Sequence, residues 1–201
     1  MIAILDYGSG NLRSAQRACE TTNHEVIITA DPVVALSADG LVVPGVGAFG
    51  ACMEGLLAIG GDEIIRSRIE AKKKVLGICV GMQILFESSE ENYQNSEPEG
   101  LGIAPGKVVK IDAPIVPHIG WNAVVAPDHS TLFKGIENER FYFVHSYAAL
   151  TTSSEFTSTT ATYGTEFLAA FESENLSAVQ FHPEKSGAAG LRLIENWART
   201  L

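Results

Sequence analysis

The feature that most constrains the fold is a series of short, almost continuously apolar runs in the first part of the chain. They are "IAILD" (2–6), "EVIIT" (25–29), "GLVVPGVGAFG" (40–50), which runs into a glycine-rich turn, and "KVLGI" (74–78). Stretches with helical periodicity separate them. Because strands that are apolar on both sides belong to parallel sheets covered by helices on both faces, the sequence predicts an α/β fold with an open, largely parallel sheet.

The intervening segments show where helices are expected. Asn11 can cap a helix that extends to about residue 22, with Leu12, Ala15 and Cys19 on one face. Two more helical stretches follow the glycine-rich turn and reach residue 72. Residues 80–87 are predicted to be helical, and a last helix is expected over 187–199.

The second half of the chain has a different texture. Residues 88–100 are polar and indicate a loop. Several of the later strands are expected to be antiparallel, and no repeat or low-complexity linker divides the chain. We therefore predict a single domain, residues 1–201. The strand-like runs of this half are 107–111, 121–126, 139–147, 157–163, 166–171 and 177–181.

Composition narrows the classes of protein that need to be considered. The formal net charge is -10, which argues against a nucleic-acid partner. No apolar run approaches the roughly 18 residues that span a bilayer, so no membrane association is expected. The three cysteines include no C-x-x-C pair, which argues against a disulfide framework or a zinc site and favours the cytoplasm.

The segment "GICVG" (77–81) places Cys79 where a buried strand turns into a helix. The pattern G-x-C-x-G has the form of the nucleophile elbow, with sulfur in place of oxygen. Small flanking residues are needed because the nucleophile occupies a tight turn with other backbone close by. The start of the following helix favours the thiolate, and the N–H of Val80 can donate to a developing oxyanion. Cys19 and Cys52, by contrast, are expected to be core residues.

A nucleophilic thiol needs a base, and "VQFHPEKS" (179–186) offers one. Pro183 favours an extended conformation at His182, so His182 and Glu184 point to the same side. A carboxylate beside an imidazole fixes its tautomer and stabilises its cation. The plain alternative is an exposed turn without chemistry. Together with the elbow, the segment predicts a Cys79–His182–Glu184 triad.

The segment "PGVGAFG" (44–50) also follows a predicted parallel strand. Ligands gather beyond the carboxyl ends of such strands, so the N–H groups of Val46 and Gly47 are candidates for a second oxyanion donor. The alternative is an ordinary strand-to-helix turn. The segment lacks the G-x-x-x-x-G-K-[ST] pattern of a phosphate loop.

Together, "PGVGAFG", "GICVGMQ" (77–83) and "FHPEKS" (181–186) resemble the class I, triad-type glutamine amidotransferases, and the resemblance covers essentially the whole chain. It implies a flavodoxin-like sheet with added antiparallel strands. It also implies that Cys79 attacks the side-chain amide of L-glutamine to form a thioester. In this step His182 takes the thiol proton and gives it to departing ammonia, and Glu184 orients His182.

The same resemblance suggests how the substrate is bound. It implies no cofactor and no metal. Gln83 and Glu91 match the positions that hold the α-amino and α-carboxylate end of glutamine, and other matching positions lie across the pocket. The implied substrate-binding residues are Gly47, Gln83, Glu91, Ser146 and Tyr147.

Within this family, "DYGSGN" (6–11), "PHIGWN" (117–122) and "FVHSY" (143–147) resemble the glutaminase subunits of imidazole glycerol phosphate synthases, which serve histidine biosynthesis. That resemblance implies a heterodimer with a (β/α)₈-barrel cyclase that consumes the ammonia. Trp121 is the expected docking residue, and the weaker interface candidates are Asn11, Tyr142 and Lys185. Ile115 departs from the family, which often has a basic residue there.

Other functions stay open at this point. One is a glutaminase subunit of another synthase, for anthranilate or pyridoxal phosphate. A second is a free-standing thiol hydrolase or peptidase, and a third is a catalytically silent scaffolding subunit. The intact triad residues argue against the third, and Gln83 with Glu91 argues against the second.

Overall fold

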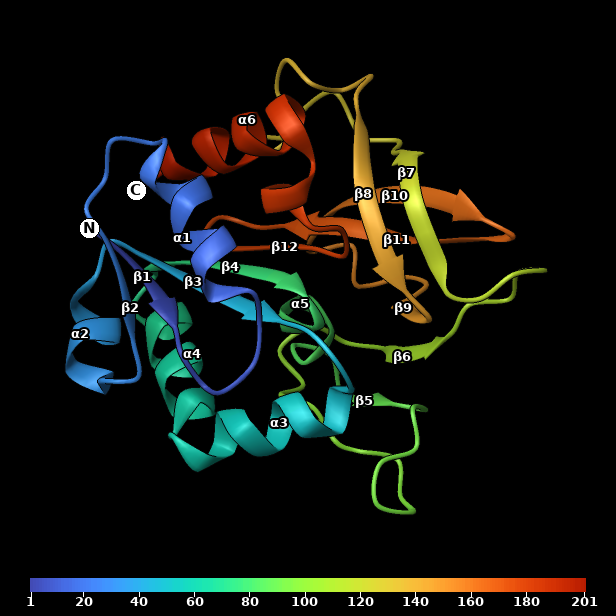
Figure 1. Cartoon of the computed structure of the whole chain (residues 1–201), viewed down its shortest axis with the longest axis horizontal. Coiled ribbons are helices and arrows are strands. Elements are labelled where there is room, and N and C mark those ends of the chain that lie inside the picture. The colour runs from blue at the N-terminus through green and yellow to red at the C-terminus, as the bar shows by residue number, and fades with distance from the viewer.

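A seven-stranded sheet runs through the centre of the protein (Figure 1), and the computed structural model describes residues 1–201. Its strands, in sheet order, are β10 (Thr157–Tyr163), β11 (Thr165–Glu172), β12 (Leu176–Val179), β4 (Lys74–Cys79), β3 (Gly40–Gly45), β1 (Ile2–Leu5) and β2 (Val26–Thr29). The run from β12 to β2 is parallel throughout, whereas β10 and β11 are antiparallel additions at one edge. The predicted fold class is confirmed.

Helices cover both faces of this sheet (Figure 1). On one face lie α1 (Leu12–Glu20) and α6 (Gly187–Ala198), and on the other lie α3 (Phe49–Ala58) and α4 (Gly61–Glu70). The side chain of Asn11 accepts a hydrogen bond from the N–H of Ser14, as expected for an N-cap. None of the helices combines the length and the apolar character needed to span a bilayer.

Two small sheets lie beyond the carboxyl ends of β3 and β4 (Figure 1). One contains β5 (Ser88–Ser89), β6 (Lys107–Lys110) and β9 (Tyr147–Ala149), and the other pairs β7 (His118–Ala123) with β8 (Arg140–His145). A one-turn 3-10 helix, η1 (Pro183–Lys185), connects β12 to α6. These elements form a roof over the edge where the central strands end.

Several elements differ from the predictions, among them that the strand expected at 139–147 is divided into β8 and β9 and that β5 lies within the predicted loop 88–100. The helix α2 (Pro32–Ser37) was not predicted, although Asp31 caps it and Pro32 occupies its first position. The helix after the elbow, α5 (Val80–Gln83), does not reach residue 87, because the N–H groups of Leu85 and Phe86 bond three residues back. The strand expected at 121–126 is β7, three residues earlier in the chain.

The hydrophobic core forms one cluster of 55 buried residues that includes both halves of the chain. A single buried arginine, Arg68 of α4, lies within it with no exposed surface. Its guanidinium has no carboxylate partner and donates instead to backbone carbonyls, which ties α4 to the segment before β3 and to β4. The acceptors are the carbonyls of Ala35, Leu36, Ala38, Asp39 and Lys74.

Candidate active site

Three neighbouring parallel strands end at the same place. In the sheet β4 lies between β3 and β12, with Gly45 opposite Cys79 and Val179 opposite Ile78. The segments that leave these strands therefore begin side by side. Sheet order explains why groups about a hundred residues apart in sequence, such as Cys79 and His182, lie in one region of the structure.

Cys79 is the turning point between β4 and α5. Its backbone has φ 56° and ψ -114°, a conformation that non-glycine residues rarely adopt. The glycines on either side are required by space. A Cβ on Gly81 would lie 1.9 Å from the carbonyl oxygen of Val43, and one on Gly77 would lie 2.7 Å from that of Gly81. The chain therefore has the close backbone approach that the elbow pattern predicts.

The helix α5 that follows this turn has one turn only, so the field of a long helix, expected over 80–87, is not available at Cys79. The N–H groups at its start remain, because the first residues of a helix have no intrahelical acceptor. Val80 is buried and borders the same cavity as Cys79.

His182 and Glu184 form a close, buried pair. Nδ1 of His182 lies 2.8 Å from Oε1 of Glu184, and both side chains are 3% exposed. Because the carboxylate only accepts, Nδ1 carries a proton and Nε2 is the nitrogen left for chemistry. The second carboxylate oxygen of Glu184 has no hydrogen-bond partner.

The surroundings of His182 act on its pKa in opposite directions. Burial lowers the pKa, but the interactions with Cys79 and Glu184 outweigh burial and raise it from 6.5 to about 9. His182 is therefore a cation at neutral pH, able to stabilise a thiolate and to donate a proton.

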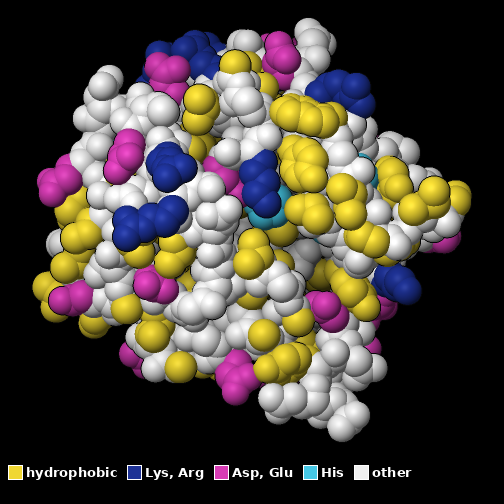
Figure 2. All heavy atoms as spheres, in the orientation of Figure 1, with side chains coloured by type: hydrophobic (Ala, Val, Ile, Leu, Met, Phe, Trp, Pro, Cys, Tyr) yellow, Lys and Arg dark blue, Asp and Glu magenta, His cyan; other side chains and the backbone are white.

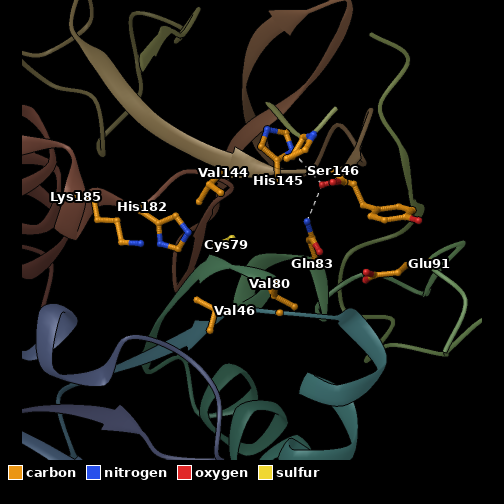
Figure 3. Close-up of a pocket in the computed structure, with 13 residues that line it drawn as sticks. Val46, Cys79, Val80, Gln83, Glu91, Val144, His145, Ser146, His182 and Lys185 are labelled. Atoms are coloured by element: carbon orange, nitrogen blue, oxygen red, sulfur yellow. Dashed lines mark hydrogen bonds between the residues drawn. The ribbon is translucent and has the colours of Figure 1, made fainter. Parts of the chain in front are cut away.

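A cavity of about 360 Å³ opens beside these groups (Figure 3). Ligand pockets in proteins are typically of this size. In Figure 3, Cys79 lies between His182 on one side and Gln83 on the other. No group of three or more His, Cys, Asp or Glu side chains is placed to hold a metal ion. The predicted site residues that line the cavity are Val46, Gly47, Cys79, Val80, Gln83, Glu91, Ser146, Tyr147, His182 and Lys185.

Gln83 lies on α5, one turn beyond the nucleophile. Its amide nitrogen donates to the carbonyl of Tyr147 at 2.8 Å and to Oε1 of Gln180 at 3.0 Å. Both amide protons are therefore used within the protein. The amide oxygen accepts no hydrogen bond from the chain, so only that oxygen remains for a substrate.

Glu91 reaches the cavity from the loop after β5. One of its carboxylate oxygens accepts from the N–H of Phe49 at 2.8 Å and so caps the start of α3. The same loop is fixed to α3 by Tyr93, whose ring packs on the backbone of Gly50 and whose hydroxyl donates to Glu54 at 2.6 Å. The second oxygen of Glu91 accepts no hydrogen bond from the chain.

One predicted oxyanion donor is contradicted by the structure. The N–H of Val46 donates to the hydroxyl of Ser9 at 3.0 Å, and that hydroxyl donates back to the carbonyl of Val46 at 2.9 Å. The Val46 peptide is therefore fixed to the segment before α1 and its N–H is not available to an oxyanion. The next N–H, of Gly47 at φ 89°, has no acceptor in the chain.

The interface candidates lie outside the cavity, apart from Lys185 at its rim. Trp121 on β7 is 48% exposed and lies edge-on to Tyr142, with ring centroids 6.1 Å apart. Asn11 is exposed at the start of α1. Figure 2 shows hydrophobic side chains gathered over the β7–β8 region, beside a hollow in which a histidine is visible. Exposed hydrophobic residues on β7 or next to it in sequence include Ile115, Ile119, Trp121 and Val125.

Sequence reasoning missed several residues of this site. Pro117, Val144 and His145 also line the cavity, and Gln180 is buried beside Cys79. Signals existed, because these residues lie within or next to "PHIGWN", "FVHSY" and "FHPEKS". The pattern could not assign them contacts, since those depend on the roof strands β7, β8 and β9.

Comparison with known proteins agrees with this arrangement. The family Glutamine amidotransferase class-I matches residues 3–200. A solved structure described as a glutamine amidotransferase superposes with a TM-score of 0.78 at 16% identity, over 99% of this chain and 97% of that chain. PurLQS from Thermotoga maritima gives 0.74 at 19% identity, over 98% and 97%. The chain belongs to the class I glutamine amidotransferase family.

Within that family the similarity is much closer to one group. The chain is 54% identical to imidazole glycerol phosphate synthase subunit HisH of Thermobifida fusca, over 100% of this chain and 98% of the relative. It is also 54% identical to the HisH subunit of Nocardia farcinica, over the same shares, and 53% identical to that of Mycobacterium tuberculosis strain H37Rv, over 98% and 96%.

Proposed function

We propose that this chain is the glutaminase subunit of an imidazole glycerol phosphate synthase and supplies ammonia for histidine biosynthesis. The observation that carries the proposal is the Cys79 elbow beside the His182–Glu184 pair, at a cavity lined by Gln83 and Glu91. The full-length similarity to HisH subunits directs it to this pathway.

The first half of the reaction forms a thioester. The Cys79 sulfur adds to the side-chain carbonyl carbon of glutamine, and the carbon–nitrogen bond then breaks. Because His182 holds a proton at neutral pH, it acts as the acid that protonates the departing nitrogen, which leaves as ammonia. Glu184 orients the ring and stabilises its cation.

The second half releases glutamate. With its proton gone, His182 takes a proton from a water molecule as the water oxygen attacks the thioester carbon. The carbon–sulfur bond breaks, and the thiolate reforms beside the imidazolium. In this proposal the oxyanion of both steps lies near the N–H groups of Val80 and Gly47.

The free acceptors of the cavity suit the amino-acid end of the substrate. The amide oxygen of Gln83 and the unpaired oxygen of Glu91 can accept from an α-ammonium group. Ser146 and Tyr147 border the same cavity. In this proposal they bind the α-carboxylate and the side-chain amide of glutamine together with Gly47.

The partner in this proposal is a (β/α)₈-barrel cyclase subunit. Ammonia in neutral water is mostly protonated and a poor nucleophile, so direct transfer between subunits preserves its reactivity. Trp121 and Tyr142 present an exposed aromatic pair for docking, with Lys185 at the cavity rim and Asn11 at the start of α1. We further propose that residues 1–201 form a single amidotransferase domain that acts in the cytoplasm.

The decisive test compares two nitrogen sources with the complete synthase. The Cys79→Ala variant, mixed with the cyclase, is expected to lose glutamine-dependent synthesis and to keep ammonia-dependent synthesis. Loss of both activities would contradict the division of labour. Peptidase activity without glutaminase activity would favour a thiol hydrolase, and stimulation of a different synthase would favour another pathway.

A further inference from the structure

Gln180 lies between β12 and η1 with no exposed surface. Its side-chain nitrogen donates to the sulfur of Cys79 at 3.8 Å. Its backbone N–H bonds to the carbonyl of Ala169 on β11, so the residue is fixed at the end of β12. The side chain of His182 also interacts with this sulfur.

The orientation of the Gln180 amide is determined by its neighbours. The carbonyl of Tyr147 can only accept, so Gln83 must present its amide nitrogen there, at 2.8 Å. The same nitrogen donates to Gln180, 3.0 Å away, which therefore presents its oxygen to Gln83. The nitrogen of Gln180 is then left facing the sulfur of Cys79.

A second branch fixes the same carbonyl. His145 Nδ1 lies 3.1 Å from the carbonyl oxygen of Tyr147, and His145 Nε2 lies 3.0 Å from His118 Nδ1. Burial lowers the pKa of His118 to about 4 and that of His145 to about 3, so both rings are neutral at physiological pH. The carbonyl then requires the proton of His145 on Nδ1, and His118 donates to Nε2. A continuous chain of donors and acceptors therefore joins β7 to the nucleophile.

We propose that Gln180 is a catalytic residue that donates a side-chain N–H to the Cys79 thiolate, in an orientation set by Gln83 and the carbonyl of Tyr147. This inference deepens the proposed function and rests on it, because it assumes that Cys79 is the nucleophile. A buried anion needs donors, and a neutral amide supplies one without competing for the proton of His182. The same N–H stabilises sulfur when the carbon–sulfur bond of the thioester breaks.

The test measures the reactivity of Cys79 in the full chain, without substrate. Iodoacetamide is the probe, and alkylation at Cys79 is followed by mass spectrometry of its peptide across about pH 5 to about pH 10. Gln180→Met removes both N–H donors at similar volume. Gln180→Glu keeps the shape and an acceptor for Gln83 but places a negative charge beside the sulfur.

The midpoint of the rate–pH profile is expected to move upward by about one pH unit in Gln180→Met, and further in Gln180→Glu. The rates at the alkaline plateau are expected to equal that of the wild type, because there the thiol is ionised in every variant. Midpoints that do not move, or rates lowered equally at every pH, overturn the inference. Asn196→Leu is the matched control, since it removes another buried amide, on α6, and should leave the profile unchanged.

Thermal unfolding checks that each variant folds. If Gln180→Met does not fold, the rate–pH profile of Gln180→Glu alone tests the inference. If neither variant folds, a measurement on Gln180 in the wild-type chain tests the inference. The side-chain amide NMR signal of Gln180 is expected to move over the same pH range as Cys79 reactivity and to stay fixed in Cys79→Ala. A signal that does not move in the wild type overturns the inference.

The glutaminase function and the role of Gln180 can be tested separately. Protection of Cys79 from iodoacetamide by L-glutamine, together with glutamate release, supports the proposed function whatever happens at Gln180. If neither is seen with the cyclase present, the proposed function itself fails. If both are seen and the Gln180 variants keep the wild-type midpoint, only the role of Gln180 is lost.

Discussion

Replacing Glu184 by glutamine would remove one charge from the active site and little else. The variant side chain keeps an oxygen that can accept from Nδ1 of His182, at the place where the carboxylate now lies 2.8 Å away. The other carboxylate oxygen has no partner, so its replacement by an NH₂ group breaks no hydrogen bond. The change therefore isolates the electrostatic contribution of Glu184.

The size of the effect follows from the pKa of His182. Burial lowers that pKa, but the interactions with Cys79 and Glu184 outweigh burial and raise it from 6.5 to about 9. Glu184 is one of the two groups that raise this pKa, so its loss is expected to lower the pKa of His182 by about one, which corresponds to roughly 1 kcal/mol or about a factor of ten. His182 is buried, so solvent screening reduces this figure little.

The assay is the pH dependence of glutamine hydrolysis, as kcat/KM, by the chain assembled with the cyclase. Because the proton on His182 is needed by the departing nitrogen, wild-type activity is expected to fall as the pH rises through about 9. In Glu184→Gln that fall is expected about one pH unit lower. If kcat/KM falls at the same alkaline pH in Glu184→Gln as in the wild type, this role of Glu184 is refuted. Glu195→Gln, at an exposed ion pair on α6, is the control.

The same pKa predicts how stability depends on pH. Because the pKa of His182 is higher in the folded chain than its ordinary 6.5, the ion pair contributes its full stabilisation below about pH 6.5. That contribution is lost as the pH rises through about 9. The denaturation midpoint of Glu184→Gln should therefore change less over this range than that of the wild type.

Three further outcomes follow from contacts described above. Ser9→Ala frees the Val46 peptide and should raise glutamate release by the isolated chain severalfold; a fall would mean that the peptide is already correctly aimed. Arg68→Met removes the guanidinium donor to five carbonyls, of which that of Leu36 keeps Lys73 as a donor, and should lower the free energy of unfolding in urea by about 3 kcal/mol; a loss below about 1 kcal/mol would contradict the role of the guanidinium. Trp121→Ala should weaken binding to the cyclase about tenfold or more by calorimetry; an unchanged affinity would exclude Trp121 from the interface.

The sequence predicted those features of the fold that depend on local pattern. The apolar runs at β1, β3 and β4 indicated the parallel sheet, because a strand buried on both faces leaves a continuous apolar signature, and the edge strand β2 is apolar although only partly buried. The elbow at Cys79 was visible because tight turns need glycine. The helix α2 escaped detection, since six residues are too few to display helical periodicity.

The contacts within the site could not be predicted in the same way. Sheet order places β4 beside both β3 and β12, and no local pattern reports the neighbours of a strand. The hydrogen bonds of Ser9 to Val46 and of Gln180 to Cys79 join positions 37 and 101 residues apart. They depend on how three loops meet, which is also why Val46 was wrongly predicted to be a free donor.

The position of β4 at the interior of the parallel sheet has a consequence for motion. A strand with partners on both sides cannot detach alone, so its amides should exchange with solvent only when most of the molecule opens. The sulfur at its tip is thereby anchored to the slowest-exchanging part of the protein. Tyr147, Ser146 and Glu91 belong to the small peripheral sheets and loops, which can shift at far lower free energy. Any signal arriving from a docked partner would therefore adjust the walls around a stationary nucleophile.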